Sequence, residues 1–206
     1  ESAEQSRLRA GRTDALHSNL WLATESDLGA VLAHLEQVKP DIFVLDSVQT
    51  VTTETAEGAA GGVAQVREVT ATLTRMLGLQ GTIGMFGHVS IRVPGTDKCF
   101  MSPGASTEKS TVRPEHIFVY NLDGTIIEHP GGLIPLEWRI HTQIHRDRPD
   151  AMCVCHLHAP HARAVAIAGK PLRPVFLHGS FLCTGVPTWN NPRLVVNDAQ
   201  ASDLSK

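Results

Sequence analysis

The stretch that decides the fold is Met152-Cys153-Val154-Cys155-His156-Leu157-His158-Ala159-Pro160-His161. Its apolar beginning predicts a buried strand, and Pro160 is typical of the first position of a helix that follows. Residues two apart on a strand project from the same face, so the imidazoles of His156 and His158 are expected to point the same way. Two neutral imidazoles at the end of an apolar strand are natural ligands of a divalent metal ion. His161 is expected only to occupy the first turn of the helix.

A helix is predicted just before this strand. Pro135 is expected to open it, and Pro149 follows its end. Glu137, His141 and His145 are spaced four residues apart and therefore form one stripe on that helix. The stripe can be interpreted as the solvated flank of a surface helix, but the neighbouring histidine pair argues against that interpretation.

Sheet is the dominant element predicted from about Thr74 onward. Val89, Ile91 and Val93 alternate with polar residues, as in a half-buried strand. Further strands are expected over 99–102 and 117–122, and Asp123-Gly124 predicts a hairpin turn leading into 125–128. The composition changes along the chain as well, because every histidine except His17 and His34 follows Phe86.

The first part of the chain has a different pattern. Helices are predicted over 2–12, over 27–38 with Ser26 or Asp27 as its cap, and over 63–76. Between them, the run 41–46 is apolar and ends in Asp46, which is typical of a parallel strand that delivers an acid to a site.

Length and composition set limits on the class of protein. The chain has 206 residues, 42% of them hydrophobic, and a net charge of -3, which predicts a soluble globular protein of one or two domains. A basic nucleic-acid-coating domain is excluded. The sequence has no run long enough for a membrane span and no signal-peptide pattern at its start, so we expect a cytoplasmic protein. The four cysteines do not suggest a disulfide framework.

Several motifs of the second half, in the same order, resemble the class II aldolase/adducin family. They are Gly87-His88-Val89-Ser90-Ile91-Arg92, Met101-Ser102-Pro103-Gly104, Pro135-Leu136-Glu137-Trp138-Arg139-Ile140-His141, Arg148-Pro149-Asp150-Ala151 and His156-Leu157-His158-Ala159-Pro160-His161-Ala162, and the likeness extends over 74–206. The resemblance implies an α/β/α sandwich around a mainly antiparallel sheet, assembled as a homo-oligomer, usually a tetramer.

The resemblance also implies the site residues. His156 and His158 match the histidines that bind a divalent metal, with Zn²⁺ expected first and Mn²⁺ or Co²⁺ as alternatives, and Glu137 matches the catalytic acid/base. His88, Ser90, Ser102 and Gly104 are expected to bind substrate. The implied activity is carbon–carbon cleavage, by aldol cleavage or decarboxylation, of a small oxo or hydroxy acid.

Three departures from the family pattern bear on that activity. A third histidine ligand in a Gly-His-Gly-like segment does not follow, and His178, the last histidine, is a poor substitute. Pro135-Leu136 replaces the small hydroxyl residues that grip a sugar phosphate, and His88 replaces an asparagine. A non-phosphorylated substrate is therefore expected, and the missing ligand leaves open whether the activity is impaired or the domain is an adducin-like scaffold without catalysis.

The first part resembles the ATPase core of the RecA-like DNA-repair family RadA/Sms. The likeness rests on Glu1 to Ala10, on Asp41 to Thr50 and on Gly61-Gly62-Val63-Ala64-Gln65-Val66-Arg67-Glu68. It implies that Asp46 is the Walker B carboxylate that holds Mg²⁺ of bound ATP. However, no G-x-x-x-x-G-K-[ST] loop occurs, so we expect neither ATP with Mg²⁺ nor DNA to be bound.

The two resemblances together predict two partial domains. A RadA-like segment without its phosphate-binding loop is expected over 1–76, and a class II aldolase-like domain, shortened at its carboxyl end, over 77–206. The chain is interpreted as a fusion or fragment of both, and a RadA-like ATPase fragment is kept as an alternative function.

Overall fold

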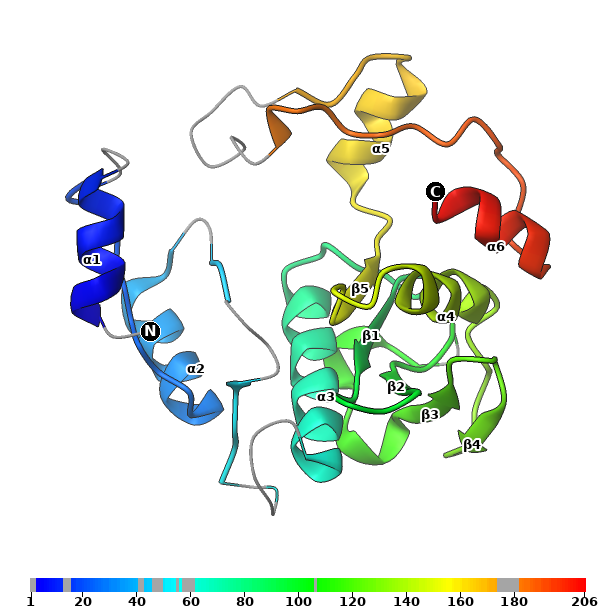
Figure 1. Cartoon of the computed structure of the whole chain (residues 1–206), viewed down its shortest axis with the longest axis horizontal. Helices are drawn as coiled ribbons and strands as arrows, with labels where there is room; N and C mark the ends of the chain where they lie inside the picture. Colours follow the sequence, from blue (N-terminus) through cyan, green and yellow to red (C-terminus); the bar gives the residue numbers. More distant parts are fainter. Residues whose placement is uncertain are drawn as a thin grey trace.

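The named strands of the described residues form a single five-stranded sheet (Figure 1). The computed structural model describes residues 3–12, 16–40, 43–45, 50–54, 56, 62–105, 107–173 and 182–206. The strands are β1 (His88–Arg92), β2 (Lys98–Met101), β3 (Phe118–Asn121), β4 (Ile126–Glu128) and β5 (Cys153–His156), in the order β4-β3-β2-β1-β5. Every neighbouring pair is antiparallel, which confirms the predicted sheet type.

Helices pack on both faces of this sheet (Figure 1). Helix α3 (Val63–Leu79) covers one face, where Val66 and Val69 join one core with Ile91, Phe100 and Val119. Helix α4 (Trp138–Asp147) lies on the other, where Trp138 packs against a second cluster. That cluster consists of Cys99, Met101, Phe118, Tyr120 and Leu122. The alternation of side chains along each strand thus separates two apolar layers, as the α/β/α prediction requires.

The predicted hairpin at Asp123-Gly124 is present between β3 and β4. Gly124 has a φ of 96°, and a Cβ atom there would lie 2.4 Å from the Trp138 ring. Two independent reasons therefore favour glycine at this turn: the backbone conformation and the close approach of the indole. Short 3₁₀ helices η2 (Lys109–Thr111) and η3 (Pro114–His116) connect β2 to β3.

Helix α4 begins three residues later than predicted, at Trp138 instead of Pro135. Pro135 and Glu137 lie in a turn in which the Trp138 amide donates to the Pro135 carbonyl over 3.3 Å, so Glu137 is the N-cap residue. Helix α5 (Pro160–Ile167) has Pro160 at its first position and His161 in its first turn, as expected. Helix α6 (Asp198–Leu204) packs on α4, where Ala201 and Ile140 form a small core with Val195 from the segment before α6.

The first part of the chain contributes α1 (Ala3–Arg12) and α2 (Leu28–Val38), both close to their predicted ranges. Asp27 caps α2 by accepting a hydrogen bond of 2.8 Å from the Ala30 amide. The strand predicted over 41–46 is wrong for the described residues 43–45, which belong to no strand. Phe43 and Val44 are exposed, because no described strand lies beside them to pair with their backbone and cover them. Asp46 lies outside the described residues.

Helix α3 joins the two parts. Its Gln65 side chain is buried, accepts from the Thr53 amide over 2.7 Å and donates to the Thr53 carbonyl over 3.1 Å. Leu28 of α2 belongs to the same core as Val66. The division expected between residues 76 and 77 falls within this continuous helix. No helix in the described part of the chain is long and apolar enough to cross a membrane.

Candidate functional site

The pairing of β1 with β5 brings two histidines together. His88 is the direct cross-strand partner of His156, so both side chains project from the same face, toward α4. Their ring centroids are 5.6 Å apart. His158 follows β5, and its ring centroid lies 4.8 Å from that of His156, which places the two histidines of the predicted pair side by side.

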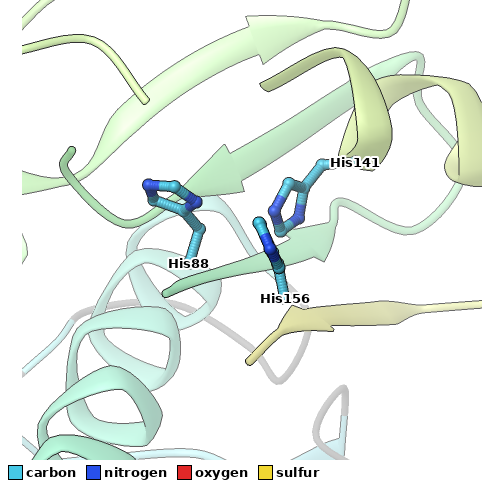
Figure 2. Close-up of side chains that lie close together, drawn as sticks. All are labelled: His88, His141 and His156. Carbon is cyan, nitrogen blue, oxygen red and sulfur yellow. The ribbon is translucent and has the colours of Figure 1, made fainter. Parts of the chain in front are cut away.

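Helix α4 adds two further imidazoles to this face. His141 and His145 are completely buried, so the predicted stripe is not a solvated flank. The ring of His141 meets that of His88 edge to face, with centroids 6.0 Å apart. Figure 2 shows the side chains of His88, His141 and His156 lying close together, each from a different element. Ligand nitrogens of these three residues lie within 4.8 Å of one another.

Ser90 links the two helical histidines. Its Oγ lies 2.8 Å from His141 Nδ1 and 2.9 Å from His145 Nε2. His145 Nδ1 in turn lies 3.0 Å from the carbonyl oxygen of Ala151. The Ser90 hydroxyl, predicted as a substrate contact, is thus fully buried and engaged with protein partners on both sides.

Glu137 enters the site from the N-cap of α4. Its Oε2 lies 3.4 Å from His156 Nδ1, while its Oε1 accepts a hydrogen bond of 3.3 Å from the Val195 amide. Ligand atoms of Glu137, His156 and His158 lie within 4.8 Å of one another. The structure therefore brings the predicted acid together with both members of the predicted metal-binding pair.

Burial favours the neutral form of four of these imidazoles, those of His88, His141, His145 and His156. It lowers the pKa of His88 to about 3, helped by the positive charge of Lys109, and lowers the pKa of His141 well below the ordinary value. The pKa of His145 falls to about 4, also mainly through burial. For His156, burial lowers the pKa and the carboxylate of Glu137 opposes the change. Neutral imidazoles have the free lone pair that a metal ion requires.

Four imidazole nitrogens of the site are buried and make no hydrogen bond within the described part of the chain: His88 Nδ1, His141 Nε2, His156 Nδ1 and His158 Nε2. Buried polar atoms are nearly always hydrogen-bonded, so four such nitrogens in one cluster need an explanation. A divalent cation fits them, because imidazole nitrogens and a carboxylate are a donor set that Zn²⁺ and similar ions accept.

Ser102 and Gly104, which are expected from the sequence to bind substrate, follow directly after β2. Ser102 Oγ accepts a hydrogen bond of 2.9 Å from the Val89 amide. Gly104 has no room for a side chain, because a Cβ atom would lie 2.6 Å from the Leu133 carbonyl oxygen. Lys109 is buried and donates from Nζ to the carbonyl oxygens of Pro103 and, over 2.8 Å, Gly104.

Sequence reasoning missed the parts played by His145 and Lys109. The helical spacing of the stripe was a signal for His145, whereas Lys109 lies in a short connecting segment without a distinguishing pattern. His178 lies outside the described residues.

The fold and this histidine-rich centre agree with the comparison to known families. The family "Class II Aldolase and Adducin N-terminal domain" matches residues 67–202, and the chain belongs to that family. This confirms the resemblance noted for the second half and places the start of the match inside α3.

Individual relatives match either the second part of the chain or the first part. The 3,4-dihydroxyphthalate decarboxylase of Arthrobacter keyseri is 32% identical over 150 residues, covering 65% of this chain and 58% of the relative. An L-fuculose 1-phosphate aldolase from Glaciozyma antarctica PI12 superposes with a TM-score of 0.60 at 19% identity, over 85% of this chain and 64% of that structure. At that identity the superposition establishes the fold alone.

The first part of the chain is similar to a different protein. The DNA repair protein RadA of Mycolicibacterium smegmatis is 55% identical over 52 residues, which cover 25% of this chain and 11% of the relative. The chain thus spans less than two thirds of the length of either curated relative. Two unrelated likenesses in one chain are consistent with a fusion or fragment of both.

Proposed function

We propose that the chain is a metal-dependent carbon–carbon lyase that cleaves a small, non-phosphorylated oxo or hydroxy acid by an aldol or decarboxylation reaction. The observation that carries the proposal is the meeting of Glu137 with His156 and His158, whose ligand atoms lie within 4.8 Å of one another. Membership in the class II aldolase and adducin family supports it.

The chemistry follows from the side chains. His156 and His158 would hold the ion, with Zn²⁺ preferred and Mn²⁺ or Co²⁺ as substitutes. A divalent cation supplies Lewis-acid polarisation of a carbonyl and stabilises the enolate that remains when the adjacent carbon–carbon bond breaks. Glu137 holds or moves the proton, since Oε2 is turned toward the pair at 3.4 Å from His156 Nδ1. The Val195 amide fixes the other carboxylate oxygen.

The substrate and assembly extend the proposal. A non-phosphorylated acid is favoured because Leu136 and Pro135 precede Glu137 where a phosphate-gripping site needs hydroxyl groups. His88, Ser102 and Gly104 are proposed to line the substrate side of the ion, with Ser90 behind them. We further propose a cytoplasmic homo-oligomer, a tetramer by family resemblance, that has no DNA partner.

Turnover of the purified chain tests the reaction class. Aromatic ortho-hydroxy acids would be assayed for CO₂ release, 4-hydroxy-2-oxo acids for pyruvate, and a sugar phosphate as the disfavoured class. We expect activity on one of the acids, loss on chelation, and recovery with Zn²⁺. Glu137→Gln should lower kcat by about 10²–10⁴-fold, the range of general acid–base catalysis.

Glu115→Gln is the matched control, because Glu115 is a carboxylate outside the site and should leave kcat unchanged. Equal kcat for Glu137→Gln and the unsubstituted chain would refute the assignment of Glu137. A folded chain that binds Zn²⁺ and turns over none of the acids would favour the scaffold alternative. Release of phosphate from ATP would instead favour the RadA-like alternative.

A further inference from the structure

We propose that His88, His141 and His156 form a second metal position of their own, an all-imidazole site that shares His156 with the proposed lyase centre. The three residues come from β1, α4 and β5, and their ligand nitrogens lie within 4.8 Å of one another (Figure 2). This position needs neither Glu137 nor His158, so it goes beyond the proposed function. Because His156 Nδ1 has only one lone pair, an ion would occupy either this position or the lyase centre, not both at once.

Unpartnered nitrogens are the first support. His88 Nδ1, His141 Nε2 and His156 Nδ1 are buried and have no hydrogen-bond partner in the described part of the chain. His88 is only 4% exposed and His141 is fully buried, so water does not readily replace a protein partner. A metal ion would satisfy these nitrogens at once, because each neutral imidazole offers one lone pair.

A chain of hydrogen bonds fixes which His141 nitrogen offers that lone pair. The Ala151 carbonyl can only accept, so His145 Nδ1 must donate to it across 3.0 Å. A neutral His145 then has an unprotonated Nε2, which accepts the hydroxyl proton of Ser90 over 2.9 Å.

Because that proton is used, Ser90 Oγ can only accept from His141 Nδ1, at 2.8 Å. His141 Nε2 is consequently unprotonated in the neutral ring. Metal-binding histidines commonly have their second nitrogen held by such an outer hydrogen bond, which sets the tautomer and the ring orientation. Ser90 and His145 are therefore positioning residues for His141.

The charges around the cluster are compatible with a cation. The Lys109 ammonium is a positive charge near His88 and would repel a cation. It donates hydrogen bonds to the carbonyl oxygens of Pro103 and Gly104. On the other side, the Glu137 carboxylate lies 3.4 Å from His156 and supplies negative charge.

Cobalt(II) titration of reciprocal variants tests the proposal, with the visible d–d absorption as the readout. His158→Ala removes a ligand of the proposed lyase centre and leaves the second position complete. His88→Asn removes a ligand of the second position and leaves the lyase centre complete. His156→Ala removes a ligand of both. We expect His158→Ala to bind Co²⁺, and the double variant His88→Asn/His158→Ala to bind at least tenfold more weakly.

The hydrogen bonds that connect His145, Ser90 and His141 are tested in the His158→Ala variant. Ser90→Ala combined with His158→Ala should weaken Co²⁺ binding by about 10–100-fold, the usual effect of removing an outer hydrogen bond. Ser18→Ala, an exposed serine, is the control. Far-UV circular dichroism verifies folding, and His88→Gln replaces His88→Asn if the latter does not fold.

The outcomes separate this proposal from the proposed lyase centre. If His158→Ala loses Co²⁺ while His88→Asn binds it, the second position is refuted and the lyase centre stands. If His88→Asn loses Co²⁺ while His158→Ala binds it, the lyase centre is refuted as a metal site and the second position stands. Unchanged binding in the double variant overturns the second position, and unchanged binding in His156→Ala overturns both.

Discussion

Replacing Ser90 by alanine should destabilise the fold more than the loss of one small side chain suggests. The hydroxyl is shared by His141 Nδ1 at 2.8 Å and His145 Nε2 at 2.9 Å, and all three residues are fully buried. Alanine would leave a donor on one ring and an acceptor on the other unpaired. Each such buried group costs about 1–3 kcal/mol, so for the two groups together we expect a loss of about 2–6 kcal/mol, the lower end applying if water enters the vacated space.

Urea unfolding of the metal-free chain at pH 8 measures this loss. Ser18→Ala should change the free energy of unfolding by less than about 0.5 kcal/mol, because Ser18 is exposed. A double-mutant cycle with His145→Phe should give a coupling of about 1 kcal/mol or more, as expected for direct partners. A Ser90→Ala loss below about 0.5 kcal/mol would refute the shared hydrogen bonds and, with them, the fixed tautomer of His141.

Three further predictions follow from single contacts. Burial lowers the pKa of His145 from 6.5 to about 4. As the pH falls from about 6.5 to about 4, only the unfolded chain gains this proton, so the free energy of unfolding should drop by about 3 kcal/mol. The urea midpoint should fall less with pH in His145→Gln than in the unsubstituted chain, and an equal fall in both would contradict this. Lys109→Met should speed hydrogen exchange of the Gly104 amide, since Nζ holds the Gly104 carbonyl at 2.8 Å; unchanged exchange would exclude that anchoring role. Gly124→Ala should lower the unfolding free energy by at least about 2 kcal/mol through a positive φ and a Cβ 2.4 Å from the Trp138 ring; Gly95→Ala, also at positive φ but in open space, should cost less, and equal melting temperatures for the two variants would argue against the indole contact.

Local patterns were sufficient to predict much of the fold. The apolar strand before Pro160, the helix that Pro160 opens and the Asp123-Gly124 turn depend mainly on neighbours in sequence, and all three are present. The strand, β5, is however half-buried instead of buried, because it lies at the edge of the sheet. The strand predicted over 41–46 fails at residues 43–45 because a strand also needs a partner, and sequence periodicity does not supply one. The start of α4 was misplaced by three residues because Pro135 opens a turn before the helix.

The site was only partly predictable for a similar reason. His156 and His158 are close in sequence, so their pairing could be inferred from strand geometry. His141 and His145 had the right spacing to share a face, but the stripe does not say whether that face meets water or the sheet. Ser90 was expected to contact substrate, and its engagement by two histidines depends on how α4 packs across β1.

The sequence by itself determined the kinds of groups that are available: imidazoles at a strand end, a carboxylate four residues before a histidine, and a chain with likenesses to two families. Only the tertiary structure decided which of them meet. The antiparallel register that sets His88 opposite His156 joins residues far apart in the chain, and the packing of α4 buries His141 beside them. Hydrogen bonds formed across these elements then determine which nitrogens stay free, because a lone pair is available only where no donor from another element reaches it.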